Sequence, residues 1–405
     1  MNPSTNKNKK NIIRVVVVAG IVLAIGYIEV NKPVNTAPSG ANTSLAVAPA
    51  SSTDSVSSAM RIAAKAKKYT TGKELAGIQG YINSPAILAN GAASTTAPFN
   101  LSDLVGKKVI LIDFWTYSCI NCLRTTPYLT AWDQKYKDAG LVIVGVHTPE
   151  FDFEKDYSNV AAAVQRLGIQ YPVVLDSNQG TWNAYHNMYW PHEFLIDIDG
   201  FVVHDHIGEG GYAETEQAIQ TALKERAQVL GVTTTVNSGI TAPTDAVSMN
   251  PSKVQSPETY FGAARNEYLG NGRFGLNGAQ TLTLPASPSP NTLYLGGTWK
   301  FSDQYAENSN PGASILFNYN AKNVYFVAAA TSSSSRQANS VRVKVFIDGQ
   351  MISKRQAGTD VGVDGSVLIQ SNRLYNLVKD VDYAAHTLRL EIEDAGLDAF
   401  TFTFG

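Results

Sequence analysis

The chain has 405 residues, more than a single hydrophobic core usually organises, so at least two domains are expected. Hydrophobic residues make up 44% and charged residues 16%, which is typical of a globular protein and excludes a largely disordered one. The 32 basic side chains nearly balance the 34 acidic ones, so the formal net charge is −2. This balance gives no basic surface for nucleic acid, and no nucleic-acid partner is expected.

The first thirty residues have the pattern of a membrane anchor. Lys7, Lys9, Lys10 and Arg14 precede or open an apolar run over residues 12–30. A helix of that length just crosses a hydrocarbon core of ~30 Å, and the basic residues before it favour a cytoplasmic N-terminus. We therefore expect residues 1–30 to form one transmembrane helix with its short cytoplasmic end, and the remainder to be exported. A cleaved signal peptide is the alternative.

Two stretches rich in Ala, Ser, Thr and Pro divide the exported part. They predict flexible linkers over residues 31–64 and 232–255, because neither stretch has apolar periodicity. The expected domains are therefore residues 65–231 and residues 256–405.

The first expected domain alternates strand and helix patterns. Strands are predicted at 108–115, 141–147 and 171–175, and a hairpin at 193–198 and 201–207 around Asp199-Gly200. Helices are predicted at 119–138, 159–167 and 213–230. This order predicts an α/β domain with a mixed central sheet flanked by helices.

The chain contains two cysteines, Cys119 and Cys122, with two residues between them. They follow a buried strand and open a helix, where free backbone N–H groups and the helix dipole stabilise a thiolate. The pair therefore predicts dithiol–disulfide exchange, with Cys119 as the attacking nucleophile and Cys122 as the resolving thiol. An inert disulfide or half of a zinc site is the alternative. Zinc would need two more ligands, and His204 and His206 are better explained as a solvated strand face.

The residues around the cysteines resemble the thioredoxin family. Asp113 lies six positions before the first cysteine, and Pro127 lies eight positions after it. The strings FWTYSCINCLRTTPYL, GVHTPEF and YWPHEFLIDIDG are similar to the extracytoplasmic part of DipZ-type proteins, among the TlpA/ResA-like redoxins. The resemblance covers roughly residues 75–231 and implies a thioredoxin-like fold. It departs from DipZ in lacking the multi-helix membrane domain, which implies a separate membrane electron donor of the CcdA/DsbD type.

The resemblance and the chemistry together imply further site residues. Asp113, a carboxylate in an apolar strand, is expected to have a raised pKa and to accept the proton of Cys122. Glu150 matches an acidic residue near the cysteines of ResA-like proteins. Trp190 and Pro191 correspond to the cis-proline loop, whose backbone would lie beside the cysteines and pair with an extended substrate.

Aromatic residues near these positions are expected to form an apolar rim for the substrate. The rim would consist of Trp115, Tyr117 and Trp190, with core packing as the alternative, whereas core packing is favoured for Trp132 and Trp182. His192 either tunes the thiolate or faces water. No metal and no cofactor are expected beyond the redox-active disulfide of Cys119 and Cys122.

The second expected domain reads as all-β. Apolar and polar residues alternate at 341–348, 387–393 and 399–404, which predicts strands of a β-sandwich. The ending GLDAFTFTFG resembles the terminal module of DipZ proteins, which implies a carbohydrate-binding-like jelly roll. Exposed aromatic side chains would stack on sugar rings, and the candidates, for each of which core packing is an equal alternative, are Tyr294, Trp299, Tyr305 and Tyr375.

The combined interpretation is a thiol-disulfide oxidoreductase anchored in a bacterial inner membrane with both domains on the periplasmic side. Disulfide-containing proteins such as apocytochrome c would be its substrates, in cytochrome c maturation or envelope redox homeostasis. One alternative is a glycan- or protein-binding envelope protein with an auxiliary redoxin domain. The other is a thiol peroxidase, since Thr116 and Cys119 match a T-x-x-C pattern, although Ile112 stands where that pattern has proline.

Overall fold

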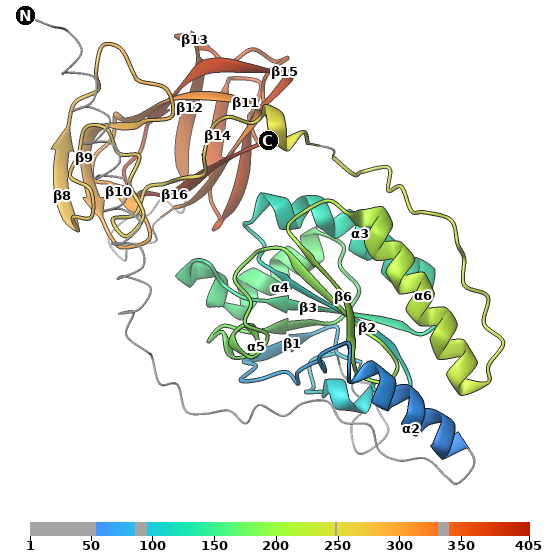
Figure 1. Cartoon of the computed structure of the whole chain (residues 1–405). Coiled ribbons are helices and arrows are strands. Elements are labelled where there is room, and N and C mark those ends of the chain that lie inside the picture. The colour runs from blue at the N-terminus through green and yellow to red at the C-terminus, as the bar shows by residue number, and fades with distance from the viewer. Residues whose placement is uncertain (1–53, 86–94, 248, 331–339) are drawn as a thin grey trace, which may run out of the picture. The chain divides into compact units, whose positions relative to one another are not determined.

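The computed structural model describes residues 54–85, 95–247, 249–330 and 340–405 (Figure 1). The expected membrane anchor over residues 12–30 and most of the expected linker over residues 31–64 lie outside these ranges. In the part of the chain that is described, no helix is both long and apolar enough to cross a membrane.

The first domain is built on a six-stranded mixed sheet with helices packed on it (Figure 1). Its strands are β1 (Gly80–Ile82), β2 (Val109–Trp115), β3 (Leu141–His147), β4 (Val173–Leu175), β5 (His192–Ile196) and β6 (Val202–Ile207). They are hydrogen-bonded in the order β1-β4-β3-β2-β5-β6. The central strand β2 runs parallel to β3 and antiparallel to β5, so the predicted mixed sheet and the β5–β6 hairpin are confirmed.

The helices of this domain follow the predicted order. They are α2 (Asp54–Lys65), α3 (Ile120–Tyr136), α4 (Tyr157–Arg166), α5 (Gly180–Ala184) and α6 (Tyr212–Leu230), with 3-10 turns η1 (Leu101–Asp103) and η2 (Asp152–Lys155). The short elements β1 and α5 were not predicted, because three to five residues are too few to show a period.

Burial on both faces explains the unbroken apolar sequence of β2, whose seven residues are all buried. Leu111 and Trp115 join the core cluster under α3 and α6, together with Cys122. Ile112 and Phe114 join the cluster on the opposite face. Because side chains alternate along a strand, Asp113 lies on the same face as Leu111 and Trp115, the face that Cys122 also contacts. As favoured, Trp132 and Trp182 are buried, in the first and the second of these clusters respectively.

Helix α2 corrects the expectation of a flexible linker up to residue 64. Arg61 binds Asp199 through two hydrogen bonds of 2.7 Å, and Lys65 binds Asp197 and Asp199 at 2.5 and 2.9 Å. These aspartates belong to the turn between β5 and β6. The composition of the segment did not reveal this, because ion pairs to a distant hairpin hold the helix in place.

The second domain is rich in strands. Its elements are η3 (Pro251–Lys253), β7 (Thr259–Tyr260), β8 (Gly278–Leu282), β9 (Leu293–Phe301), β10 (Ala306–Asn308), β11 (Ala313–Ala330), β12 (Val341–Ile347), β13 (Gln350–Met351), β14 (Ser366–Ile369), β15 (Arg373–Ile392) and β16 (Leu397–Phe404). The strands predicted at 341–348 and 387–393 each extend one residue past the end of β12 and β15, and the strand predicted at 399–404 lies within β16, so all three are confirmed.

Strand β11 organises this second sheet. Along one edge it pairs first with β9, through residues 314–317, and then with β16, through residues 324–330, while β15 pairs along its other edge. A strand that changes partners in this way turns a corner around a core. Trp299 and Tyr375 belong to that core, and Tyr294 is also buried, with at most 8% exposure for the three, so core packing is the alternative that holds for these candidates for sugar stacking.

Candidate active site

The two cysteines lie at the start of α3, where β2 ends. Cys119 is the N-cap residue, with an extended backbone (φ −80°, ψ 116°), and it is half-buried. Cys122 lies one turn into the helix and is 2% exposed. Both are free thiols in this structure. Burial, together with the neighbouring Cys119 thiol, raises the pKa of Cys122 well above its ordinary value, so the outer thiol is the reactive one and the inner thiol needs help to ionise.

Asp113 lies behind the buried thiol. It is 2% exposed, and burial raises its pKa to about 8. Its neighbours on the same face of β2, Leu111 and Trp115, share a core cluster with Cys122, and the charge of Asp113 is among the causes that raise the pKa of that thiol. A carboxyl in this position can exchange a proton with the resolving thiol.

Glu154 is a second buried carboxyl at the site, and the sequence analysis did not identify it. It accepts hydrogen bonds of 2.5 Å from the hydroxyls of Thr116 and Ser118, in the loop that leads to Cys119. It also accepts the backbone N–H groups of Glu150 and Phe151 at 2.6 and 2.9 Å. Burial raises its pKa to about 7. The contacts indicate that Glu154 fixes the shape of the loop. A single glutamate in a short polar segment carries no pattern by which to predict this.

The structure corrects two members of the expected apolar rim. Trp115 and Tyr117 are each 1% exposed and pack on His147, with ring centroids 5.2 and 5.5 Å away. Burial lowers the pKa of His147 to about 3, so this imidazole is neutral, and its Nε2 accepts the backbone N–H of Tyr117 at 3.4 Å. Trp115, Tyr117 and His147 pack in the core against the loop that leads to Cys119. Trp115 and Tyr117 therefore do not face a substrate.

The loop before β5 lies beside the outer thiol. The Trp190–Pro191 peptide bond is cis, as the resemblance implied. The Trp190 carbonyl oxygen is 3.9 Å from the Sγ of Cys119, and the Trp190 side chain is half-buried against Trp182. The preceding residues Met188 and Tyr189 are 69% and 46% exposed, so an apolar surface continues outward from the thiol.

His192 does not face water. It is 7% exposed, and its Nδ1 is 2.6 Å from the side-chain oxygen of Asn187. Burial lowers its pKa, although Asp205, 3.6 Å from its Nε2, opposes that shift. The ring packs on Phe194 with a centroid distance of 4.0 Å.

Glu150 occupies a different setting from the one expected. Its Oε1 accepts hydrogen bonds from Arg265 at 2.7 Å and from the Tyr260 hydroxyl at 2.9 Å, both in the β-rich domain. The structure therefore places Glu150 in a contact between the two domains.

Side chains next to the cysteines also contact the β-rich domain. Ile120, which lies between the two cysteines, belongs to a buried apolar cluster with Phe151, Tyr325 and Phe400. Arg124, two residues after Cys122, is 4% exposed and is bound by Glu209 of its own domain at 2.6 and 2.7 Å, and a Cβ built at Gly405 of the β-rich domain would lie 3.1 Å from its Nη1. No single-sequence pattern links residues so distant in the chain.

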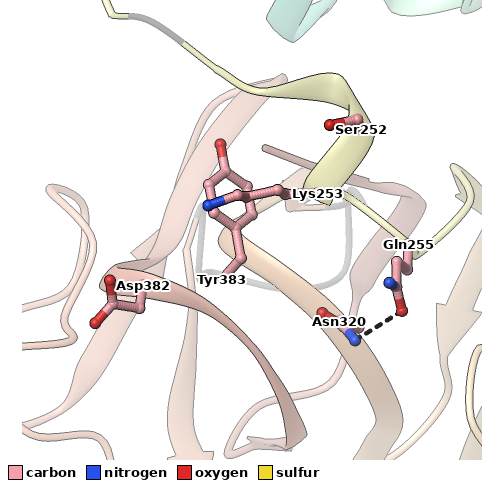
Figure 2. A pocket seen from close by; sticks show the side chains of 6 residues that line it. All are labelled: Ser252, Lys253, Gln255, Asn320, Asp382 and Tyr383. Atoms are coloured by element: carbon pink, nitrogen blue, oxygen red, sulfur yellow. Dashed lines mark hydrogen bonds between the residues drawn. The ribbon is translucent and has the colours of Figure 1, made fainter.

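Among the described residues, no group of three or more His, Cys, Asp or Glu side chains is placed to hold a metal ion. In the β-rich domain, a pocket of about 360 Å³ is lined by Ser252, Lys253, Gln255, Asn320, Asp382 and Tyr383 (Figure 2).

Two family models match the chain. The Redoxin model matches residues 82–223, and the model of the thioredoxin-like C-terminal domain matches residues 256–405. The protein DipZ of Mycobacterium tuberculosis (strain CDC 1551 / Oshkosh) is 36% identical over 343 residues, which is 85% of this chain and 44% of DipZ. The chain thus spans less than half the length of that relative.

Two shorter relatives are thiol-disulfide oxidoreductases. The thiol-disulfide oxidoreductase YkuV of Bacillus subtilis (strain 168) is 30% identical over 122 residues, which is 30% of this chain and 82% of YkuV. The thiol-disulfide oxidoreductase ResA of Bacillus thuringiensis (strain Al Hakam) is 34% identical over 125 residues, which is 31% of this chain and 66% of ResA. Residues 82–223, which the Redoxin model matches, contain the Cys119–Cys122 pair.

Proposed function

The chain belongs to the thioredoxin-like thiol-disulfide oxidoreductases, and we propose that it exchanges disulfides with proteins outside the cytoplasm. The observation that supports this most is the geometry of the pair. A half-buried thiol caps α3 beside the Trp190 carbonyl, and a buried thiol lies one turn inward. This arrangement gives a substrate access to one sulfur at a time.

The reaction begins at Cys119. Its thiolate attacks one sulfur of the substrate disulfide, and the other substrate sulfur leaves as a thiolate and takes a proton from solvent. Cys122 then loses its proton to Asp113 and attacks the Sγ of Cys119. The mixed disulfide breaks, the second substrate thiolate is released, and Cys119 and Cys122 are left oxidised. A donor dithiol reverses these steps and restores the reduced pair.

Extended substrates would bind at the loop before β5. The Trp190 backbone next to Cys119 offers a carbonyl to an added strand, and the exposed side chains of Met188 and Tyr189 offer apolar contact. The role of Trp190 and Pro191 as substrate-binding residues rests on this placement.

The cellular setting is part of the proposal. The basic residues before the apolar run at 12–30 favour a single-pass anchor in a bacterial inner membrane, with both domains in the periplasm. There the enzyme would act on apocytochrome c or on other envelope proteins, and would receive electrons from a membrane protein of the CcdA/DsbD type. Without the anchor, the chain would not reach such a donor efficiently.

Trapping tests substrate and donor together. Cys122→Ser leaves Cys119 able to form a mixed disulfide that cannot resolve, so partners should be recovered covalently from cells and released by dithiothreitol. Cys119→Ser is the matched control and should trap none of them. Recovery of the same proteins with both variants would overturn the assignment of Cys119 as the nucleophile.

A glycan-binding role for the β-rich domain is the second candidate, favoured by the pocket in Figure 2. Its wall combines the Tyr383 ring with the polar groups of Asp382 and Asn320. Sugars are bound by such mixtures of an aromatic face and hydrogen-bonding groups. Lys253 lies with its Nζ 5.7 Å from the centre of the Tyr383 ring and would have to move aside.

Calorimetric titration with oligomers of N-acetylglucosamine and of mannose tests this role. Binding that is lost in Tyr383→Ala and kept in Tyr157→Ala, an exposed tyrosine of the other domain, would support it. Equal heats for the wild type and both variants would exclude this pocket as the site for these sugars.

A further inference from the structure

Three ionisable side chains lie in one row across the sheet behind the cysteines. Asp113 on β2 is directly opposite Glu193 on β5, and Glu193 is directly opposite His206 on β6. Directly opposed residues of antiparallel strands point to the same face, with Cβ atoms about 4.5–5.5 Å apart. The row therefore begins on the face that Cys122 contacts and ends on β6, the edge strand of the sheet.

Each member of the row has a buried polar atom without a hydrogen-bond partner among the described residues. These atoms are Oδ1 of Asp113, Oε2 of Glu193 and Nε2 of His206. Buried polar atoms are nearly always paired, so three consecutive exceptions in one row call for a common explanation. Groups that pass a proton between them, directly or through water, provide one.

The surroundings of Glu193 are apolar except for a few groups. Asp113 and His206 flank it on β2 and β6, and the Thr215 hydroxyl of α6 donates a hydrogen bond to it. The charge of Glu193 also helps to raise the pKa of Tyr171, before β4, and of Tyr212, at the start of α6. The pKa of Tyr171 is raised in addition by the charges of Asp113, Asp133 and Cys122. No cation is among these groups.

Burial raises the pKa of Glu193 to about 8, and the charge of Asp113 adds to the shift. Two carboxyls so close in an apolar setting do not both ionise near neutral pH, so the pair holds at least one proton and titrates as a unit. Such a pair can take up a proton at Asp113 while it gives one up at Glu193.

His206 provides the outer end. It is half-buried on the edge strand, and a Cβ built at Gly211 (φ 58°) would lie 2.4 Å from its Cε1, so the loop before α6 closes over the ring. An imidazole accepts a proton at one nitrogen and releases one at the other, which suits transfer between a buried carboxyl and solvent.

We propose that Glu193 and His206 carry the proton of Cys122 from Asp113 to solvent. The S–H bond of Cys122 breaks as an O–H bond forms on Asp113, Asp113 passes a proton to Glu193, and Glu193 passes one to His206, which releases it. No electrons move along the row, because the electron pair of Cys122 forms the bond to Cys119. The inference rests on the proposed role of Asp113 as the first acceptor and extends it by two positioning residues.

The test measures how fast the mixed disulfide resolves in the purified 405-residue chain, from pH 5.5 to 9.5. Mixed disulfide is formed with a small aromatic disulfide that releases a coloured thiol, and the second release reports resolution. We expect Glu193→Gln to slow resolution by about threefold to tenfold below pH 8, within the range that a positioned proton carrier contributes. The dependence of the resolution rate on pH should also show one ionisation in place of two. Glu193→Asp keeps a carboxyl, so it should restore part of the rate and part of the second ionisation.

Variants of two histidines on β6 test whether the proton leaves through His206. His206→Asn should slow resolution in weakly buffered solution, and added imidazole should restore it. His204→Asn is the control, because His204 lies on the same face of β6 but opposes Leu195 and is bonded to Thr215 at 3.1 Å. The mixed disulfide of the His204→Asn variant should resolve at the wild-type rate.

The outcomes distinguish the role of Asp113 as first proton acceptor from the relay through Glu193 and His206. If Asp113→Asn is slow but Glu193→Gln keeps the wild-type rate and pH profile, the relay is wrong and the Asp113 role stands. Wild-type behaviour of both variants would overturn both. If Glu193→Gln loses its circular-dichroism signal, His206→Asn decides in its place, and a wild-type resolution rate of that variant in weakly buffered solution overturns the relay.

Discussion

Glu150 of the first domain and Arg265 of the β-rich domain form an ion pair at 2.7 Å, with Tyr260 sharing the same carboxylate oxygen. The Glu150 side chain is 12% exposed in this pair, and the Arg265 guanidinium lies 3.7 Å from the Tyr260 ring centre. Both of these side-chain partners of Glu150 belong to the β-rich domain. The carboxylate therefore serves the contact between the two domains.

Glu150→Gln tests this assignment. The amide keeps the shape but loses the charge, so we expect the free energy of unfolding to fall by about 1–2 kcal/mol, in the range of a hydrogen bond to a charged group. Resolution of the mixed disulfide should be unchanged. Urea unfolding and the release assay measure the two quantities, and a tenfold slower resolution with unchanged stability would return Glu150 to the catalytic site.

Phe400 is the central contact of the apolar cluster that includes Ile120. It is 4% exposed and meets the rings of Phe151 and Phe153 at 5.0 and 4.8 Å. Removal of a buried phenyl ring usually costs about 3–5 kcal/mol, so Phe400→Ala should lower the free energy of unfolding by that order. Phe274→Ala, at a site 64% exposed, is the control and should change it little. Similar melting curves for both variants would show that this cluster contributes little.

The order of reactivity of the two thiols follows from their burial. Cys122 is 2% exposed and its thiolate is disfavoured, whereas Cys119 caps a helix and is half-buried. Iodoacetamide at pH 7 should therefore modify Cys119 at least tenfold faster, an order that follows from the thiolate fraction. Peptide mass spectrometry after timed quenching measures both sites. Equal rates between pH 5 and 9 would contradict the assignment.

Features of the fold and of the site could be predicted from the sequence where their signal lies within a short stretch of the chain. The buried strand β2 and the cysteine pair at the start of α3 follow from short contiguous patterns, and the cis bond before Pro191 was implied by the family resemblance. Asp113 was recognised because a carboxylate stands out in an apolar run. Glu193 is likewise a carboxylate in an apolar strand, β5, but the sequence analysis considered this stretch for its proline and its turn and did not identify Glu193.

Residues whose roles depend on distant partners were not predictable. Glu154 gains its role from Thr116 and Ser118, which lie 38 and 36 positions away. Trp115 and Tyr117 were expected at the rim, yet the pairing of β2 with β3 places them over His147 in the core. A sequence pattern reports that a side chain is apolar but does not say which surface covers it.

Asp113→Asn gives the sharpest prediction for pH. The ordinary pKa of an aspartate is about 3.9, whereas the folded protein raises that of Asp113 to about 8, so the folded state binds this proton more tightly than the unfolded chain does. The carboxyl therefore destabilises the fold increasingly as the pH rises from about 4 to about 8, and fully above that.

The asparagine variant removes that penalty and also the proton acceptor. Its free energy of unfolding should match the wild type near pH 4 and exceed it above pH 8 by on the order of 2–5 kcal/mol. Resolution in the wild type should accelerate as the pH rises through 8, because only about a tenth of Asp113 is ionised at pH 7. In Asp113→Asn it should be at least tenfold slower at pH 8 and lack that rise. Urea titrations at pH 4, 7 and 9 and the release assay measure both effects. A variant less stable at pH 9 than the wild type would identify Asp113 as a structural residue, since loss of a strained carboxylate cannot destabilise the fold.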